Sequence, residues 1–595
     1  MSNDEYSFGP FRVDRVAMRL VRDGQEQPLR HQAVRLLCVL IEREGMAASF
    51  EDLGLWAWGQ THVEKNNVIV TAHEVRNALG RDYKHYIKTV RGGYLFRRPG
   101  RVYEAQGTTV GERHSVVLTT FEDAMAAKDN VHLAKGITSE LLRTLSKIGR
   151  LRVVDATPQT VQLLPTGRTE ETHLVEGSVA GTRDRPEVHV KLLNLPGREI
   201  VWSETYFTTI AGIQGLQSRI AVKIAEAIKL KLDAEDANKM RHEEEVDGAT
   251  YELFLRGLNH WSRPSEVNLF RAIEYFRQAT LRQPGYAKAF GAMAHAYGLL
   301  GFAGFMPPEH AMPQAESAAR RCLEIFPDSP EGLAGLAAVE GYYLWRWKTA
   351  EEHLKRAIAL NPNYETGHHL YAMGCLMPQL RLKEALREIS TAQELNPLSP
   401  FVVTCVGIVK YYARDYRGAV EQFDRAIKMQ PQAYLAHWHR GWALAELDRF
   451  DEAVAAIGGA VEMSQGAPAA LAAFGQVLAA AGQVEESRRI LGQLKEVAAE
   501  RYVSPYDLAL IYISLGDDAK AFALLRDAVD QRVPMLARLR VHPLFRRYRA
   551  NSQYLELLRA VNLSPGKERK TETRPKSGRR ASKTRKGNDV RGRKK

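Results

Sequence analysis

The sequence YIKTVRGGYLF at residues 86–96 has the pattern of a β-hairpin. Two adjacent glycines, Gly92 and Gly93, separate two short runs that are rich in β-branched and aromatic residues. Such runs are typical of strands, and a glycine pair between them is typical of a tight turn. We therefore predict two antiparallel strands that turn at the glycines.

A helix is predicted directly before this hairpin, over residues 66–79. Its buried face is expected to carry four apolar residues at helical spacing, which are Val68, Ala72, Val75 and Leu79. The opposite face is expected to carry Asn67, Thr71, His73, Glu74 and Arg76. Two earlier helices, over 33–41 and 50–58, and short strands within residues 1–30 complete the expectation of an α+β domain in residues 1–100.

These residues together resemble the OmpR/PhoB-type winged helix over residues 5–98, because VRNALG at 75–80 ends the helix and TVRGGYLF at 89–96 forms the wing. The resemblance implies that the third helix lies in the major groove of double-stranded DNA and that the wing reaches the adjacent minor groove. It also allows two copies to bind a direct-repeat operator as a homodimer, although nothing in the residues shows dimerisation. The DNA contacts that it implies are Asn67, Thr71, His73, Glu74 and Arg76 on the helix, and Thr89 and Arg91 on the wing.

One residue of this set departs from the family pattern. Many members carry a further arginine where this chain has Glu74. A carboxylate accepts a hydrogen bond from cytosine N4 but repels phosphate, so base preference is not transferred from the family. We expect replacement of Arg76 or Arg91 with alanine to weaken DNA binding while leaving stability nearly unchanged.

Positive charge is concentrated in two places. Residues 76–101 hold eight basic side chains against Asp82 alone, which supports contact with phosphates. Residues 567–595 hold fourteen Lys or Arg and three acidic residues, so this tail accounts for +11 of the net +13. The tail, taken as 563–595, is predicted to be disordered, and it is either a nonspecific DNA tether or a solubilising end.

The longest region, 248–562, repeats every 34 or 35 residues. Small residues recur along one track at Ala350, Ala385, Ala419, Ala453, Ser487 and Ala521. A second track runs through Ala357, Ala392, Ala426 and Ala460, and prolines recur at Pro362, Pro397 and Pro431. A 34-residue period with two helices per unit is the tetratricopeptide spacing, and the alanines allow the paired helices to approach closely. We predict an all-α solenoid that binds a protein or peptide partner and ends in a cap at 530–560 with a polar outer face.

Two clusters in this region have more than one interpretation. The aromatic residues Tyr342, Tyr343, Trp345 and Trp347 are interpreted mainly as core, with a peptide-binding patch as the alternative. The histidines at 368–369, and at 437 and 439, suggest metal ligands, but adjacent helical residues point to different faces. We therefore interpret them as packing residues and predict no metal site.

Residues 115–232 alternate strand and helix patterns and form the predicted α/β middle domain, between linkers at 101–114 and 233–247. SVVLTTF at 115–121, GITSELL at 136–142 and LVEGSV at 174–179 resemble the amino-terminal domain of TolB. GSVAG at 177–181 is not a nucleophile elbow, because its serine is not the central residue. We predict no catalytic residues and no cofactor; a buried ligand site in this domain remains an alternative.

The sequence as a whole predicts a multidomain cytoplasmic protein that is not an enzyme. It has no apolar run of 18 residues, no secretory signal, and four widely spaced cysteines. We predict a sequence-specific transcriptional regulator whose activity is set by protein or ligand binding to the repeat and middle domains. The first alternative is a protein-interaction scaffold with a vestigial or docking winged helix. A nucleotide-cyclase relative is a third possibility, and the sequence has no cyclase-like segment before residue 115.

Overall fold

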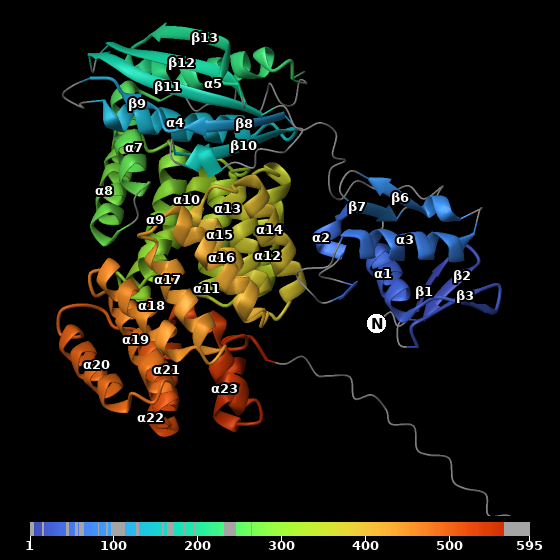
Figure 1. The fold of residues 1–595 in the computed structure, drawn as a ribbon. Helices are drawn as coiled ribbons and strands as arrows, with labels where there is room; N and C mark the ends of the chain where they lie inside the picture. Colours follow the sequence, from blue (N-terminus) through green and yellow to red (C-terminus); the bar gives the residue numbers. More distant parts are fainter. Residues whose placement is uncertain are drawn as a thin grey trace, which may run out of the picture. The chain divides into compact units, whose positions relative to one another are not determined.

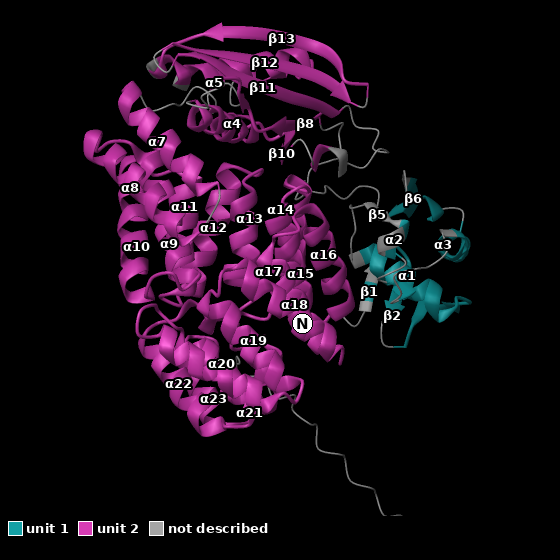
Figure 2. Ribbon diagram, turned by 60° about the vertical axis from the view of Figure 1, so that its left-hand side comes forward, with its two compact units in different colours: residues 1–112 teal, residues 113–595 magenta. Residues whose placement is uncertain are grey.

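The chain forms two compact units, residues 1–112 and residues 113–595, which are described separately (Figure 2). The computed structural model describes residues 5–14, 17–42, 47–53, 57–58, 65–80, 83–90, 93–96, 114–125, 130–157, 160–163, 172–182, 185–195, 197–230, 232, 246–262 and 265–564. Figure 1 shows the elements in chain order. The basic tail after residue 564 lies outside the described residues.

The N-terminal unit combines two small antiparallel sheets with helices. Its first sheet has the order β1 (Glu5–Phe8), β2 (Phe11–Asp14), β3 (Arg19–Arg22) and β4 (Gln25–Gln27). The helices are α1 (His31–Glu42), α2 (Phe50–Leu53) and α3 (Lys65–Leu79), followed by the single turn η2 (Lys84–Tyr86). Buried side chains such as Phe11, Leu36, Val75 and Phe96 form its core. Of the helix predicted over 50–58, the structure describes Phe50–Leu53 as helical, and residues 54–56 lie outside the described part.

The predicted hairpin is present. Strands β6 (Ile87–Val90) and β7 (Gly93–Phe96) pair antiparallel with Val90 opposite Gly93, and the residues of the turn itself are not described. A third strand, β5 (Ala47–Ser49), pairs with the other edge of β7. The hairpin and α3 therefore belong to one folded unit, with Ile87, Tyr94 and Phe96 packed in its core.

The second unit begins with a mixed sheet of order β10-β8-β11-β12-β13. Its elements are β8 (His114–Thr119), β9 (Glu122–Asp123), α4 (Val131–Ser146), β10 (Leu151–Ala156), η3 (Thr160–Leu163), β11 (Thr172–Thr182), β12 (Arg185–Leu195), β13 (Glu199–Phe207) and α5 (Ile210–Ala227). Strand β8 runs parallel to β10 and β11, and β11 to β13 are antiparallel. Val116 and Leu118 pack in one core with α4 and α5, because alternate side chains of a strand point to opposite faces. The α/β pattern predicted for this region is confirmed.

Helices fill the rest of this unit, in pairs. The first six are α7 (Gly248–Trp261), α8 (Glu266–Arg282), α9 (Ala287–Phe302), α10 (Pro308–Ile325), α11 (Pro330–Tyr342) and α12 (Trp347–Leu360). They are followed by α13 (Glu365–Leu370) with the π-helical turn η4 (Tyr371–Leu376), α14 (Leu382–Leu395), α15 (Pro400–Tyr412), α16 (Tyr416–Met429), α17 (Tyr434–Ala445) and α18 (Phe450–Met463). The last elements are α19 (Pro468–Ala480), α20 (Val484–Val497), α21 (Pro505–Leu515), α22 (Asp518–Asp530), η5 (Pro534–Arg538), η6 (Pro543–Tyr548) and α23 (Ser552–Ala560).

The 34-residue period is visible in these boundaries. The second helices of successive pairs begin at Trp347, Leu382, Tyr416, Phe450, Val484 and Asp518. All six residues of the first predicted track are fully buried, as are the four alanines of the second. Ser487 keeps its buried hydroxyl satisfied by donating to the Gly475 carbonyl at 2.7 Å. The tetratricopeptide solenoid predicted from the sequence is confirmed.

The sheet region is not a separate domain, because it shares a core with the first solenoid helices. Tyr251, Phe254 and Phe276 of α7 and α8 lie in the same buried cluster as Val116 and Leu118. A Cβ atom at Gly136 of α4 would lie 2.6 Å from a methyl of Leu255, so glycine permits this close contact. The division into domains 115–232 and 248–562 therefore does not describe two independent units; residues 233–245 of the expected linker are not described.

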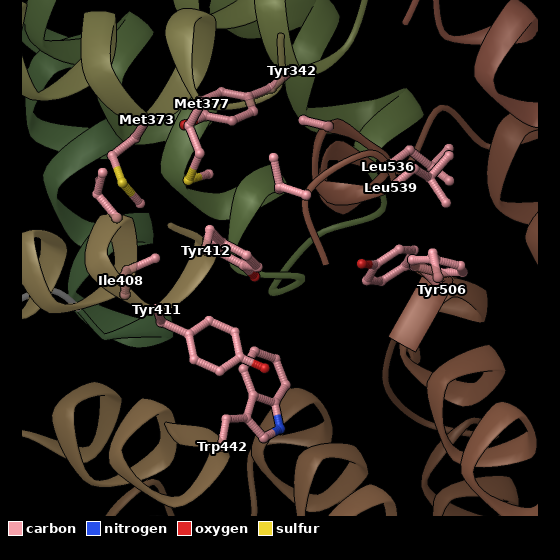
Figure 3. Packing of buried hydrophobic residues seen from close by; sticks show 14 of the residues in the cluster. Tyr342, Met373, Met377, Ile408, Tyr411, Tyr412, Trp442, Tyr506, Leu536 and Leu539 are labelled. Atoms are coloured by element: carbon pink, nitrogen blue, oxygen red, sulfur yellow. The ribbon is translucent and has the colours of Figure 1, made fainter. Parts of the chain in front are cut away.

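The C-terminal segment, residues 531–563, packs on the last helical pair and also runs back into the helical array. The Trp347 indole Nε1 donates to the Val561 carbonyl at 3.0 Å, and the Asn562 side chain donates to the Trp345 carbonyl at 3.3 Å. Leu536 and Leu539 pack with Tyr342 and Tyr412 (Figure 3). Helix α23 buries Tyr554, Leu557 and Leu558, and its exposed polar residues are Ser552, Gln553, Glu556 and Arg559. The expected cap with a polar outer face therefore stays a prediction. The superhelix interior is apolar, and the segment fills it.

The aromatic cluster belongs to this interior. Tyr342, Trp345 and Trp347 are buried in the same core as the C-terminal segment, and Tyr343 packs at its margin in a separate cluster. Their interpretation as core residues is confirmed, and these three buried rings are not available to a peptide in this arrangement.

Candidate nucleic-acid interface

Helix α3 has one buried and one exposed side. Val68, Ala72, Val75 and Leu79 are fully buried, as the sequence predicts. Thr71 lies with them: it is 3% exposed, and its hydroxyl donates to the Asn67 carbonyl at 2.7 Å. The expectation that Thr71 lies on the outer face is therefore wrong. Residues 68, 71, 72 and 75 follow the i, i+3, i+4, i+7 spacing of a single helical face.

The outer side of α3 carries a different set from the predicted one. Its exposed residues are Asn66, Asn67, Ile69, Val70, His73 and Asn77. Val70 is 59% exposed, and Val70, Asn66 and Asn77 are not among the contacts expected from the sequence. Residues 66, 70, 73 and 77 lie on the side of α3 opposite the buried residues 68, 72 and 75. The helical period alone therefore predicts this outer face. His73 Nδ1 and Asn77 Nδ2 lie 3.1 Å apart, which places both side chains on this outer stripe.

Glu74 is held by a residue far away in the sequence. Its Oε2 accepts from Arg30 Nε at 2.9 Å and from Nη2 at 2.5 Å, and its Oε1 accepts from the Arg30 backbone N–H at 3.2 Å. Hydrogen bonds from the Arg30 side chain hold the pKa of Glu74 below its ordinary value. The positive charge of Arg30 neutralises the Glu74 carboxylate, which would otherwise repel phosphate. Direct base contact by Glu74 stays a prediction. Because Arg30 is exposed and lies next to Glu74, it becomes a further candidate for phosphate contact.

Arg76 connects α3 to the hairpin. Its Nε and Nη2 donate to the Ile87 carbonyl at 2.9 and 2.7 Å, and Nη2 also donates to the Thr89 hydroxyl at 2.9 Å. The guanidinium lies 5.0 Å from the centre of the Tyr94 ring. These contacts fix the wing against the helix. Nη1 makes none of these hydrogen bonds, so it is the guanidinium nitrogen left for the predicted contact of Arg76 with DNA.

The wing itself contributes exposed polar side chains. Lys84, Lys88 and Thr89 are exposed. Arg91, the second predicted contact on the wing, lies outside the described residues, as do Arg81, Arg97, Arg98 and Arg101 of the basic run. Within the described part, the interface thus consists of an amide-rich helix face with two apolar residues, next to Lys84 of η2 and Lys88 of the hairpin. Amides read base edges, an exposed valine contacts the thymine methyl group, and lysines bind phosphate.

Two segments of the chain match known families. Residues 24–103 match the family described as "Transcriptional regulatory protein, C terminal". Residues 24–103 form an OmpR/PhoB-type winged-helix domain. Residues 407–468 match the tetratricopeptide repeat family. The chain is therefore a multidomain protein that joins a transcription-regulatory DNA-binding domain to tetratricopeptide repeats; the TolB-like assignment of the middle region stays a prediction.

Two curated proteins are similar to parts of the chain. Putative adenylate cyclase 3 of Rhizobium meliloti is 21% identical over 208 residues, which are 33% of this chain and 35% of that protein. Anaphase-promoting complex subunit 3 of Schizosaccharomyces pombe is 25% identical over 109 residues, which are 18% of this chain and 16% of that protein. The chain thus spans well under two thirds of either relative.

Solved structures are similar to about a third of the chain. Pseudomonas aeruginosa pilF is 22% identical and covers 34% of this chain and 88% of its own, with a TM-score of 0.26. A thermophilic tetratricopeptide protein of Thermus thermophilus is 19% identical and covers 31% of this chain and 98% of its own, with a TM-score of 0.28.

Two further observations concern other kinds of site. The His368 ring bonds to Glu388 at 2.7 Å and to the Pro362 carbonyl at 3.1 Å, and His439 Nδ1 donates to the Leu435 carbonyl at 2.9 Å, which agrees with packing roles. In the part of the chain that the structure describes, no three potential metal ligands cluster, and no helix is long and apolar enough to cross a bilayer.

Proposed function

We propose that this protein is a sequence-specific DNA-binding transcriptional regulator whose activity is set by protein or ligand binding to its repeat and middle regions. The observation that carries this proposal is the outer stripe of α3, Asn66, Val70, His73 and Asn77, next to a hairpin that Arg76 holds in place. We further propose that the protein acts in the cytoplasm, without enzymatic activity or a cofactor, and that two copies bind adjacent half-sites on double-stranded DNA.

The chemistry of the stripe supports base reading. Asparagine pairs with adenine through two hydrogen bonds, and an exposed valine packs on the thymine methyl group, so the stripe favours A·T pairs in the major groove. Lys84 and Lys88 are exposed on the hairpin side, where they supply charge for phosphate contacts. Of the residues implied by the family resemblance, we retain Asn67, His73, Thr89 and Arg91 as DNA contacts, with Glu74 and Arg76 as further candidates.

The remaining regions supply regulation in this proposal. The sheet region and the first solenoid helices share one core, so a change in one is transmitted mechanically to the other. The solenoid interior is filled by the C-terminal segment, and a protein partner therefore binds the outer helix faces or displaces this segment.

The proposal is tested by recovering and sequencing the genomic fragments that bind the full chain. We expect a common motif, and an affinity that falls steeply with salt, with a log–log slope of roughly −0.9 per phosphate contacted. Asn67→Ala and Val70→Ala should weaken binding to that motif by about 10-fold, since a good base contact contributes ~1–3 kcal/mol. Gln25→Ala, an exposed change on β4, is the matched control. Absence of a motif would contradict the proposal.

The scaffold alternative is favoured by one observation, the exposed apolar residues Ile69 and Val70 side by side on α3. A protein partner docking there would bind with little dependence on salt. If Val70→Ala leaves DNA binding intact but removes a protein partner, the winged helix is a docking surface.

A further inference from the structure

The mixed sheet of the second unit ends in a bare strand. Strand β13, EIVWSETYF at 199–207, pairs with β12 on one side, and no other strand of the described chain pairs with its second side (Figure 1). Its side chains are all exposed or half-buried, and Ile200 and Phe207 are 61% and 76% exposed. The strand contains neither lysine nor proline, which often protect such an edge. A long, apolar edge of this kind is a template for pairing with a further strand.

The backbone of β13 offers hydrogen-bonding groups along this edge. The Thr208 N–H donates to the Pro186 carbonyl at 3.2 Å, which fixes the alternation of hydrogen-bonded residues between β12 and β13. In an antiparallel pair, every second residue directs its N–H and C=O to the neighbouring strand, and the residues between them direct theirs away. Ser203, Thr205 and Phe207 therefore direct their backbone groups to the open edge.

We propose that β13 pairs antiparallel with β13 of a second copy of this chain, so that two sheets join edge to edge about a two-fold axis at Thr205. The register between β12 and β13 shifts at Val201, and α5 begins after Thr209, its N-cap. Residues 202–208 lie between these two limits and have Thr205 at their centre. A two-fold axis at Thr205 therefore lets the whole regular stretch pair.

The side chains of β13 match their own image in this register. Glu204 lies opposite Tyr206 of the second copy, and within one chain the Tyr206 hydroxyl already donates to Glu204 at 3.1 Å. Phe207 lies opposite Ser203, and Thr205 faces itself, which is a favourable cross-strand pair. An axis at Glu204 would instead set two carboxylates opposite each other, and like charges in that position are destabilising. This self-match favours a second copy of the chain over an unrelated strand.

The inference goes beyond the proposed function, because it concerns association of the second unit in the absence of DNA. The variants that test it lie outside the N-terminal unit, so its failure leaves the test of DNA binding unaffected. An edge pairing of this size belongs to the weak, transient class of interface, so sedimentation velocity of the full chain should span ~1 to ~100 µM.

We expect the wild-type chain to shift from monomer to dimer over this range. Thr205→Lys and Thr205→Glu, each alone, should weaken self-association by about 10-fold or more, because the new side chain faces a like charge across the axis. An equimolar mixture of the two should associate within about 3-fold of wild type, since lysine then faces glutamate. Thr182→Lys, the same exchange at an exposed residue of β11, should leave association unchanged.

Recovery in the mixture also separates the pairing from damage to the fold. Both variants lose the contact between Thr205 Oγ1 and His189 Nδ1, which lie 2.8 Å apart, and mixing cannot restore it. Three results would overturn the assignment. They are a wild-type chain that stays monomeric over the whole concentration range, variants that associate as tightly as wild type, and a mixture that associates no better than either variant alone.

Discussion

Arg76 Nη2 donates a hydrogen bond to the Thr89 hydroxyl at 2.9 Å, and two further hydrogen bonds from Arg76 reach the Ile87 carbonyl. Helix α3 and strand β6 are therefore joined by one side chain. This relationship changes what is expected of the Arg76→Ala variant. The sequence alone predicts loss of DNA binding with unchanged stability, whereas the structure predicts that the N-terminal unit itself is weakened.

We predict that Arg76→Ala destabilises the N-terminal unit by about 1.5–3 kcal/mol, the usual contribution of hydrogen bonds from a charged group. Hydrogen exchange of the α3 amides in the full chain measures this directly, since it reports the opening of one unit. Asn67→Ala is the control, because Asn67 is exposed; it should reduce DNA affinity and leave exchange unchanged. Equal protection in the two variants would show that Arg76 has no structural role.

Glu140 provides a prediction about pH. Burial raises its pKa, but the charges of Arg143 and Lys288, at 2.6 and 3.1 Å, outweigh this and hold the pKa at about 2. A carboxyl pKa below the ordinary 4.5 stabilises the folded state above pH 4.5, and the stabilisation is lost as the pH falls towards 2. We expect Glu140→Gln to destabilise the second unit by about 3–5 kcal/mol at pH 7, because it leaves buried cations unpaired.

The measurement for Glu140 is the thermal unfolding midpoint between pH 2 and 7. The wild-type curve should fall over this acidic range more steeply than the variant curve. Glu176→Gln, which breaks the more exposed pair with Arg198, should change the midpoint little at any pH. Parallel curves for wild type and Glu140→Gln would contradict the assigned pKa.

Two glycines of adjacent helices test the close packing of the repeats. A Cβ atom at Gly441 would lie 2.3 Å from Ile457 Cγ1 and 2.9 Å from the Ala453 carbonyl oxygen, whereas one at Gly459 would meet only Met463 Cε at 3.9 Å. Gly441→Ala should therefore destabilise the solenoid by about 1–3 kcal/mol. Gly459→Ala should stabilise it by about 0.5–1 kcal/mol, because alanine favours a helix. The denaturant midpoints of unfolding of the two variants measure these changes in stability. Similar midpoints for Gly441→Ala and Gly459→Ala would refute the packing argument.

Two tryptophans test the attachment of the C-terminal segment. Trp347 donates to the Val561 carbonyl, while the buried Nε1 of Trp438 has no acceptor in the described structure. Replacing either with phenylalanine removes similar apolar area, but only Trp347→Phe loses a hydrogen bond and leaves a carbonyl unpaired. We expect it to cost about 1–3 kcal/mol more than Trp438→Phe. Limited proteolysis between residues 531 and 563 should also be faster in the Trp347 variant, and equal rates would count against this attachment.

Much of the architecture could be predicted from local pattern. The small-residue tracks identified the repeats, because only a small side chain fits where two helices meet, and every residue of both tracks is fully buried. The hairpin at 86–96 was predicted from strand-forming residues around paired glycines. On α3, however, Thr71 was assigned to the wrong face because its polarity was given more weight than its position in the helical period. Val70 is apolar and yet exposed, since its position in the helical period places it on the outer face.

Contacts between residues far apart in the chain could not be predicted in this way. Glu74 binds Arg30, which is 44 residues away, and Trp347 binds a carbonyl 214 residues away. The residues around Arg30 and Val561 do not indicate these pairings, because the sequence contains many other arginines and carbonyls that are chemically equivalent.

The hairpin, the helical period and the two matched families follow from local sequence, since each depends on neighbours within about one repeat length. Three features appear only once the chain is folded: the sheet region shares a core with the solenoid, the C-terminal segment packs into the helical array, and Arg76 holds the wing. These outcomes depend on which apolar surfaces remain uncovered once the local elements have formed, and the chain buries them wherever its connectivity allows.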